Sequence, residues 1–552
     1  MAATSTAGPP QGASAPSGGS DGHAVPSVGA PIVDVAIVGF GPCGAVAAGL
    51  LGGMGLRVWA CDRATEIYDK PRAFALDHEI MRVFQQLGVH ERVLERAEPF
   101  TPSEFVGVDG QLIKRFATAD PPFPQAFPPA LVFNQPHCER VLRDHVASLP
   151  NVQVALGCEL LSVLQDETAA TLHVRHAGGR EEQVRARWVI GCDGASSTVR
   201  AQAGIALDDL GFDQPWLVVD VLVTPEGAAR LPQVSMQFCE PARPTTFLIG
   251  PGNHRRWEIS INEGEDPKAV ATPEGTWRLL SRWIGPEHAT LWRQASYRFH
   301  ALVADRWRAG RVFVAGDAAH QQPPFLGQGM CQGVRDVVNL TWKLEAVLRG
   351  RAGEALLDTY GSERRAHVEA LTTRIKAIGQ LIGERDIDKA RARDAHLLAE
   401  CGGVVPSMPR ADVQPPIGPG LRADDAPAGT QFPQPWLQTP QGPQRMDDVI
   451  GRGWRVVLAP GVDAEWQAAA SRFDDARCVA LGTAAFTETD GIAAAWLQRH
   501  GAQAAIVRPD HYVYGVASTP EQLDQQRQAL RQGLTTTGDK HERQPHDTPQ
   551  PA

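Results

Sequence analysis

Apolar residues recur in two spacings along the chain. Short β-branched runs predict buried strands at residues 33–39, 56–61, 185–190 and 311–315. Helical spacing predicts helices at 42–55, 78–87, 136–148 and 333–348, with a further helical region over about 363–400. The first strand, a glycine turn, a helix and the second strand form a βαβ unit, which predicts a parallel sheet.

Other stretches carry a different pattern. Residues 216–261 alternate apolar and polar positions, as in LVVDVLV and RRWEISI, which predicts an antiparallel sheet. Ten prolines at 402–443 indicate a linker or an extended wrapping segment, and 445–530 return to the pattern of a small α/β domain. We therefore expect an α/β fold with an arm at 1–30, a main body at 31–375 containing the antiparallel sheet at about 210–300, a helical and Pro-rich linker at 376–444, a C-terminal domain at 445–535 and a tail at 536–552.

Composition narrows the function classes. The net charge is −10, which disfavours nucleic-acid binding through the overall field. Residues 1–30 hold 22 Ala, Gly, Ser or Pro and no secretory pattern, so a disordered arm is expected, as is a loose tail. Residues 35–56 lack any charge, but their glycine spacing favours a strand–turn–helix over a membrane span. The nine cysteines show no CxxC or zinc spacing, which suits reduced thiols in the cytoplasm and predicts no metal site.

A glycine motif follows the first strand. Gly39, Gly41 and Gly44 match GxGxxG, in which the glycines permit a tight turn, backbone approach to a pyrophosphate and close helix packing. The diphosphate would bind at the helix N-terminus. Asp62 ends the second strand, where its carboxylate can accept ribose hydroxyls. The motif predicts a dinucleotide site without separating FAD from NAD.

Two further segments place an Asp beside a Gly just beyond a strand. One is Asp193-Gly194, and the other is Gly316-Asp317, which continues through Pro324 and Gly327-Gln328-Gly329 into the 333–348 helix. The second segment predicts another helix N-terminus directed at a ligand, with an Asp suited to a ribitol hydroxyl.

These three motifs, in this order over residues 33–375, resemble the class A flavoprotein aromatic hydroxylases. The resemblance implies a Rossmann-like FAD-binding domain interleaved with an antiparallel-sheet substrate domain. It implies FAD as cofactor, with NADH or NADPH and O2 as co-substrates. The residues it implies for the cofactor are Val38, Gly39, Gly41, Pro42, Cys43, Gly44, Asp62, Arg63, Arg72, Gln135, Asp193, Gly194, Gly316, Asp317, Pro324, Gly327, Gly329 and Met330.

Within that class, several stretches are similar to the 3-(3-hydroxyphenyl)propionate and 3-hydroxycinnamate hydroxylases, among them residues 71–79, 240–244, 255–258 and 508–510. This implies ortho-hydroxylation of these phenols to 2,3-dihydroxyphenyl products through a flavin hydroperoxide. It also implies a thioredoxin-like C-terminal domain, here without CxxC, for which a structural or dimerisation role is expected. The implied partners are a small phenolic carboxylate and a second copy of the chain, without nucleic acid or membrane.

The substrate's carboxylate needs a cation, and Arg243, Arg255 and Arg256 are the candidates, each of which could instead be a solvated strand charge. His320 could face the flavin or serve the helix start, and the group that deprotonates the phenol is not identified. The alternatives are the same chemistry on another phenol (a resorcinol, a chlorophenol or a polyketide), a flavin dehydrogenase that avoids oxygen, or a non-catalytic FAD-binding protein.

Overall fold

The computed structural model describes residues 32–535, except for the side chains of residues 411 and 412. The expected arm at 1–30 and tail at 536–552 lie outside the described residues.

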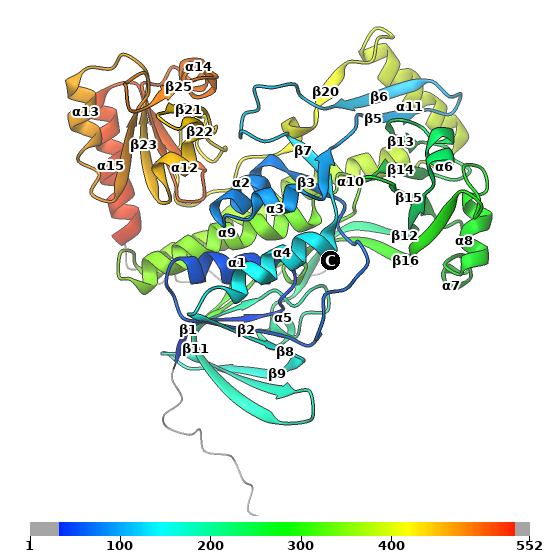
Figure 1. The fold of residues 1–552 in the computed structure, drawn as a ribbon, viewed down its shortest axis with the longest axis horizontal. Coiled ribbons are helices and arrows are strands. Elements are labelled where there is room, and N and C mark those ends of the chain that lie inside the picture. Colours follow the sequence, from blue (N-terminus) through cyan, green and yellow to red (C-terminus); the bar gives the residue numbers. More distant parts are fainter. Residues whose placement is uncertain (1–31, 536–552) are drawn as a thin grey trace, which may run out of the picture. The chain divides into compact units, whose positions relative to one another are not determined.

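Strands between residues 33 and 314 form a sheet whose central strands are parallel (Figure 1). Its order is β17-β18-β11-β1-β2-β8, and β1 pairs in parallel with both β2 and β11. The strands are β1 (Val33–Val38), β2 (Val58–Asp62), β8 (Val152–Leu156), β11 (Glu181–Gly191), β17 (Arg308–Ala309) and β18 (Val312–Val314), and β9 (Cys158–Gln165) and β10 (Ala170–His176) extend the sheet from β11. The predicted βαβ unit is therefore present, and the carboxyl ends of β1, β2, β11 and β18 meet at one edge.

Helix α1 (Pro42–Gly53) follows β1 and is buried along most of its length. It packs against α4 (Gln135–Ala147) and α9 (Gly329–Leu348). Its small residues permit this close approach: a Cβ on Gly52 would lie 2.5 Å from Val152. The neighbouring elements are α2 (His78–Gln86), α3 (His90–Leu94), α5 (Thr198–Gln202), and a small sheet of β3 (Ala75–Asp77), β4 (Ala97–Pro99) and β7 (Ala130–Phe133).

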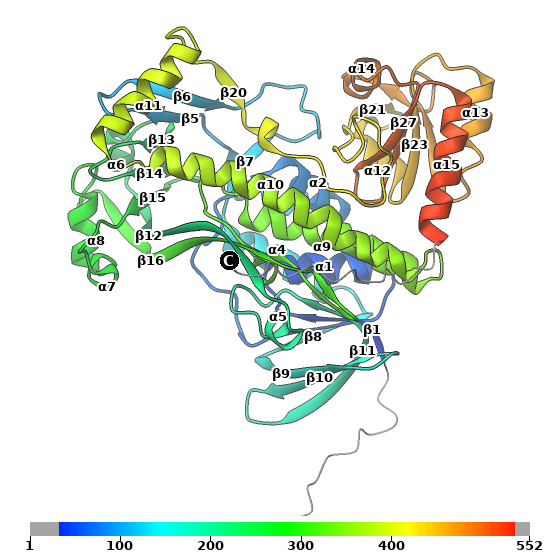
Figure 2. The same ribbon diagram turned by 180° about the vertical axis from the view of Figure 1, so that it is seen from behind.

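A second, mainly antiparallel sheet has the order β19-β16-β12-β15-β14-β13-β5-β6-β20. Figure 2 shows its two longest strands, β12 (Leu207–Val223) and β16 (Ala289–Ala304), side by side. The others are β5 (Ser103–Val106), β6 (Leu112–Ala117), β13 (Ser235–Phe238), β14 (Thr245–Ile249), β15 (His254–Ser260), β19 (His320–Gln321) and β20 (Ser407–Pro409). Helices α6 (Pro225–Arg230), α7 (Pro267–Val270) and α8 (Pro273–Leu280) follow its strands.

The segment predicted as a linker is part of the folded body. Two helices, α10 (Asp358–Ile382) and α11 (Ile387–Glu400), take the place of the single predicted helical region, and β20 then pairs with β6. Beyond a short 3₁₀ turn at Arg410–Val413, the side chains of Ile417, Leu421 and Phe432 are buried. Because these apolar groups lie among prolines, the composition of the segment hid its packing.

The C-terminal domain has a four-stranded sheet in the order β24-β23-β26-β27, with β23 parallel to β24 and antiparallel to β26. After the β21–β22 hairpin the chain runs through α, β, α, β, β, α, β, β and α. The thioredoxin-like assignment of this domain stays a prediction. Its elements are β21 (Trp436–Thr439), β22 (Gly442–Arg445), α12 (Met446–Ile450), β23 (Trp454–Leu458), α13 (Ala464–Ala470), β24 (Ala476–Ala480), β25 (Thr487–Glu488), α14 (Ile492–Arg499), β26 (Ala504–Val507), β27 (Val513–Ala517) and α15 (Pro520–Thr535).

A buried ion cluster joins this domain to the main body. Arg508 donates to both carboxylate oxygens of Glu363 on α10, at 2.8 and 2.9 Å, and also pairs with Asp510. Lys343 of α9 donates to the same Glu363 at 2.8 Å. All four side chains are fully buried or nearly so, so their charges are balanced within the protein.

No helix among residues 32–535 is long and apolar enough to cross a membrane. The uncharged stretch that begins at Val35 forms β1, the glycine turn and α1.

Candidate active site

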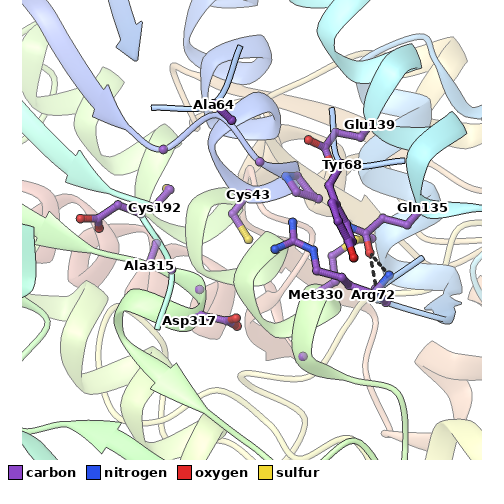
Figure 3. A pocket seen from close by; sticks show the side chains of 18 of the residues that line it. Cys43, Ala64, Tyr68, Arg72, Gln135, Glu139, Cys192, Ala315, Asp317 and Met330 are labelled. Atoms are coloured by element: carbon purple, nitrogen blue, oxygen red, sulfur yellow. Dashed lines mark hydrogen bonds between the residues drawn. The ribbon is translucent and has the colours of Figure 1, made fainter. Parts of the chain in front are cut away.

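A cavity of about 570 Å³ opens where the carboxyl ends of the parallel strands meet the second sheet. Every residue predicted to bind the cofactor, except Gly44, lines this cavity. Figure 3 labels some of the lining residues, with Cys43, Arg72, Asp317 and Met330 arranged around a common space. The three motifs, separated by more than 100 residues in the chain, therefore surround one site.

The first motif forms the turn between β1 and α1. Gly39 has φ of +95°, and a Cβ there would lie 2.3 Å from the carbonyl oxygen of Cys192. A Cβ on Gly44 would lie 1.9 Å from the carbonyl oxygen of Gly39, so Gly44 packs the helix on the strand and does not line the cavity. A Cβ on Gly41 would meet open space. Gly39 thus forms the tight turn and Gly44 the close helix–strand contact, while the approach of a pyrophosphate to Gly41 stays a prediction.

Asp62 ends β2 at the same edge. Its carboxylate accepts from the backbone N–H of Phe40 at 2.7 Å and from that of Ala64 at 2.8 Å. These bonds hold the carboxylate beside the glycine turn, and an ionised carboxylate has further lone pairs to accept other donors. Its position is the one expected of an acid that binds a ribose.

The second motif forms the turn after β11. Gly194 has φ of +83° and lines the cavity. The carboxylate of Asp193 accepts from the Ser197 hydroxyl at 2.5 Å and from the Val199 N–H at 3.0 Å. Burial raises the pKa of Asp193, against the lowering effect of these two bonds. The Asp193 side chain therefore orders its own loop, and direct binding of a nucleotide by it stays a prediction.

The third motif, after β18, contributes a carboxylate to the cavity. Asp317 projects into the cavity and forms no hydrogen bond or ion pair with another residue in the described part of the chain. Burial raises its pKa, while nearby His320 and Arg72 lower it. Gly327 (φ +66°) and Gly329 then lead into α9, whose first turn has no side-chain cap and no acidic residue.

A loop across the cavity carries Arg72. Gln135, the first residue of α4, accepts the backbone N–H groups of Arg72 and Ala73 at 3.0 and 2.5 Å (Figure 3). The helix cap is its neighbour Asn134, which accepts from His137. The Arg72 guanidinium lies 5.9 Å from the Tyr68 ring centroid and lines the cavity. Gln135 thus positions the loop that presents Arg72.

Comparison with known proteins gives this arrangement a family. Residues 32–375 match the FAD binding domain family, and residues 429–533 match the HcaD C-terminal domain family. A probable NADH-specific resorcinol 4-hydroxylase of Rhodococcus jostii (strain RHA1) is 36% identical over 90% of this chain and 94% of its own length. A 3-(3-hydroxy-phenyl)propionate/3-hydroxycinnamic acid hydroxylase of Burkholderia vietnamiensis (strain G4 / LMG 22486) is 32% identical over 87% of this chain and 92% of its own length. The chain belongs to the FAD-dependent aromatic hydroxylases.

The solved structure of the flavin-dependent monooxygenase PieE in complex with FAD and substrate has the same fold as this hydroxylase. The TM-score is 0.76 at 23% sequence identity, and the match covers 91% of this chain and 99% of PieE. The expected Rossmann-like domain with an interleaved antiparallel sheet is therefore confirmed.

The groups that line the cavity of this hydroxylase match the chemical groups of FAD. The N-termini of α1 and α9 both open on it, and neither first turn has a side-chain cap. Unpaired N–H groups at helix starts bind phosphate oxygens. Cβ atoms on Gly41, Gly194 and Gly329 would all meet open space at its wall. An unpartnered carboxylate at Asp317 suits the hydroxyls of a ribityl chain. Phosphates, hydroxyls and an aromatic ring are thus each matched by a part of the wall.

Three of the predicted substrate-site residues, Arg243, Arg255 and His320, lie away from the cavity. Arg243 forms a bidentate pair with Glu265, at 2.6 and 2.9 Å. Arg255 donates to the carbonyl oxygens of Gly252 and His254. Neither arginine lines the cavity. On β15 successive side chains point to opposite faces, so Arg255 shares its face with Trp257, which packs under α8.

His320 is also turned away from the cavity. Its ring is buried, bonds to Asp336 at 2.8 Å and stacks on Trp307. Asp336 in turn accepts the backbone N–H of Gly316 at 2.9 Å. His320 therefore supports the turn that presents Asp317 and does not line the cavity, which favours the structural one of the two roles considered for it.

Arg256 does line the cavity, but its charge is already paired. It donates to both carboxylate oxygens of Asp220, at 2.7 and 3.0 Å, and to the carbonyl oxygens of Pro71 and Arg72. Asp220 also bonds to His254 at 2.7 Å. Arg256 thus holds the loop of Arg72 against the second sheet and has little charge left for a substrate carboxylate.

Among the lining residues that the sequence analysis did not single out are Glu258 and Arg410. Glu258 follows Arg256 on the same face of β15, a position that the alternation of that strand could have indicated. Arg410 comes from the Pro-rich segment that was expected to be a linker, and no pattern around it marks it as part of a site. The cavity is thus completed from the second sheet and from residue 410.

The cysteines and possible metal ligands add no second centre. All nine cysteines lie within residues 32–535, and none is in a disulfide. Burial raises the pKa of Cys43 well above its ordinary value, which keeps its thiol protonated beside the glycine turn. No group of three His, Cys, Asp or Glu side chains in the described part of the chain could hold a metal ion.

Proposed function

We propose that this enzyme hydroxylates 3-(3-hydroxyphenyl)propionate and 3-hydroxycinnamate ortho to their hydroxyl, giving the 2,3-dihydroxyphenyl products. The overall reaction combines the phenol, O2, NAD(P)H and a proton, and yields the dihydroxy product, NAD(P)⁺ and water. Bound FAD, reduced by the nicotinamide nucleotide, supplies an electrophilic oxygen atom from O2. The relative named for this substrate supports the assignment.

The chain's own residues would bind the cofactor and close the site. The amides at the starts of α1 and α9 would bind phosphates, Asp62 the ribose, and Asp317 the ribityl chain. Apolar side chains line the side that faces the second sheet, namely Phe74, Phe100, Leu248 and Phe325. This apolar wall excludes water, which is needed because water would divert the activated oxygen into H2O2.

The observation that favours an anionic substrate is the position of Arg410. Its guanidinium lines the cavity and stacks 4.1 Å from the Phe100 ring centroid. It donates to the Ser103 hydroxyl and the Leu326 carbonyl oxygen, each at 3.3 Å, and forms no ion pair with any carboxylate of the described residues. Burial lowers the pKa of Arg410 to about 10. A half-buried cation without a counter-ion favours an anionic ligand, and a guanidinium binds a carboxylate in two places.

A second candidate substrate is resorcinol, which has no carboxylate. The higher identity to the resorcinol 4-hydroxylase favours it. The same relative, named NADH-specific, favours NADH over NADPH as the reductant.

A panel of phenols tests the proposal. The FAD-loaded enzyme should oxidise NADH faster when 3-(3-hydroxyphenyl)propionate is added, and mass spectrometry should find the product one oxygen atom heavier. Stimulation by resorcinol but not by 3-(3-hydroxyphenyl)propionate would overturn the substrate assignment in favour of the second candidate.

A variant of Arg410 tests the carboxylate contact. Arg410→Met removes the charge and keeps much of the side chain's length. A hydrogen bond to a charged group contributes about 1.5–3 kcal/mol, so KM for 3-(3-hydroxyphenyl)propionate should rise by roughly 10- to 100-fold. KM for resorcinol should stay the same, and an equal rise for both phenols would refute the contact.

A further inference from the structure

Glu258 is a carboxylate on the substrate side of the cavity whose use the fold does not explain. It lies on β15, is 3% exposed, and lines the cavity. Its side-chain carboxylate forms no hydrogen bond or ion pair with any other side chain or backbone group in residues 32–535. Buried carboxylates are normally paired, so an unpaired one that faces a cavity points to a ligand.

The neighbours of Glu258 are known from the strand register. Val218 of β12 and Thr246 of β14 stand opposite it in the sheet. The Thr246 hydroxyl donates to Gln237 at 2.6 Å, so it is bonded elsewhere. The carboxyl group of Glu258 is therefore free to accept a proton or hydrogen bond from a molecule in the cavity.

The charged groups around Glu258 are already committed to one another. Arg256 on β15 is paired with Asp220 on β12, and Arg293 on β16 donates to the Pro71 carbonyl oxygen and the Tyr297 hydroxyl. Burial raises the pKa of Glu258 to about 7, against the lowering effect of Arg256 and Arg293. The carboxyl group is neutral below that pH and ionised above it. A proton acceptor works best when its pKa lies near the pH of the reaction.

We infer that Glu258 accepts the proton of the substrate's phenolic hydroxyl during hydroxylation, an inference that rests on the proposed function. The O–H bond of the phenol breaks and an O–H bond forms on the Glu258 carboxylate. The electron pair left on the phenolic oxygen moves into the ring, and the ortho carbon bonds to one oxygen atom derived from O2 while the O–O bond breaks and the other oxygen atom leaves as water. The hydrogen on that carbon leaves as a proton, its bonding pair restores the aromatic ring, and Glu258 returns its proton to the phenolic oxygen. The oxidant is O2 and the reductant is NAD(P)H, as in the overall reaction.

Arg410 and Glu258 then divide substrate recognition between two ends. Both line the one cavity, Arg410 from the turn after β20 and Glu258 from β15. A phenol with a carboxylate side chain presents an anion to the cation and an acidic hydroxyl to the proton acceptor. Substrates without a carboxylate would still use Glu258, because every phenol carries the hydroxyl.

The test compares Glu258→Gln with Glu258→Asp and Glu104→Gln in the FAD-loaded full-length enzyme, with 3-(3-hydroxyphenyl)propionate and resorcinol as probes. Glu104 on β5 is the matched control, because it bonds to Arg115 and does not line the cavity. General base catalysis contributes about 10²–10⁴-fold, so Glu258→Gln should lower product formation at least about 100-fold. NADH should still reduce its flavin, with O2 converted mainly to H2O2. Glu104→Gln should match the wild type.

Two readouts separate this role from a merely structural one. The rate of the wild-type enzyme should rise with pH through a limb near 7, and Glu258→Gln should lose that limb while Glu258→Asp keeps one. A ring-fluorinated 3-(3-hydroxyphenyl)propionate, whose hydroxyl is more acidic, should recover much of the lost rate of Glu258→Gln. An unchanged pH limb, or an equal deficit with the fluorinated and the unfluorinated 3-(3-hydroxyphenyl)propionate, would overturn the inference.

The two proposals fail in different ways. If the wild-type enzyme hydroxylates neither phenol, the proposed function fails and the inference on Glu258 falls with it. If the wild-type enzyme hydroxylates one of them and Glu258→Gln does so equally well, only the inference on Glu258 falls.

Discussion

Replacing Asp317 by Asn should affect FAD binding and protein stability in opposite directions. The substitution removes the charge and keeps the shape of a carboxylate that projects into the cavity without a partner among the described residues. If Asp317 accepts ribityl hydroxyls, the loss of a charged hydrogen bond costs about 1.5–3 kcal/mol. The dissociation constant for FAD should therefore rise by roughly 10- to 100-fold.

The apoprotein should become more stable in the same variant. The protein around the cavity desolvates the Asp317 carboxylate and raises its pKa in the folded protein, so the ionised carboxylate disfavours folding, and because the side chain is exposed to the cavity this penalty is small. This penalty is complete above the folded-state pKa and disappears as the pH falls below the unfolded-state value. The stabilisation by Asp317→Asn should accordingly be present at neutral pH and absent in acid.

Titration of the apoprotein with FAD, followed by flavin fluorescence, measures the first effect, and thermal unfolding of the apoprotein at several pH values measures the second. Asp144→Asn is the control, because Asp144 is exposed and pairs only with Arg92 at the surface. Unchanged FAD affinity together with an unchanged unfolding temperature would refute the role given to Asp317.

Two further predictions concern the glycine turn and the buried cluster. Gly39→Ala should unfold the protein or abolish FAD binding, because the φ of Gly39 is +95° and the added Cβ would overlap Cys192. Gly41→Val should keep the fold and weaken FAD binding, because the valine side chain would enter the open cavity. Thermal unfolding with and without FAD distinguishes the two variants. Glu363→Gln should cost about 3–5 kcal/mol of stability in a urea titration, because it leaves Arg508 and Lys343 with less counter-charge. Burial raises the pKa of Glu363, but Arg508 and Lys343 outweigh this effect and hold the pKa at about 2. The stability that Glu363 contributes should therefore be complete above the usual carboxyl pKa and be lost as the pH falls toward 2. A Glu363→Gln variant as stable as the wild type, or a stable Gly39→Ala that binds FAD normally, would contradict these expectations.

The parts of the fold that the sequence predicted are those set by local pattern. Helix α1 begins at Pro42 as expected, because the glycine turn and the apolar run leave few alternatives. Helix α9 begins at Gly329, four residues before the predicted start, because its first turn belongs to the motif that follows Gly327. The motif residues around the cavity were predictable for the same reason, since each lies directly after a strand.

The rest of the site depends on long-range contacts. Arg410 reaches the cavity because β20 pairs with β6, almost 300 residues earlier in the chain, and nothing near Arg410 encodes that pairing. Arg243 resembled a substrate ligand in sequence, yet Glu265 neutralises it. Charge and spacing alone could not decide which arginine faces the substrate, because that depends on which of them already has a partner.

The fate of the oxygen atoms tests the central claim, that the three motifs hold FAD where it can hydroxylate a phenol. The FAD-loaded enzyme is supplied with NADH, 3-(3-hydroxyphenyl)propionate and ¹⁸O₂, and the product is analysed by mass spectrometry. One ¹⁸O atom should be found in the ring hydroxyl that the enzyme adds. A product without ¹⁸O, or NADH oxidation that yields only H2O2 with every phenol of the panel, would contradict the account.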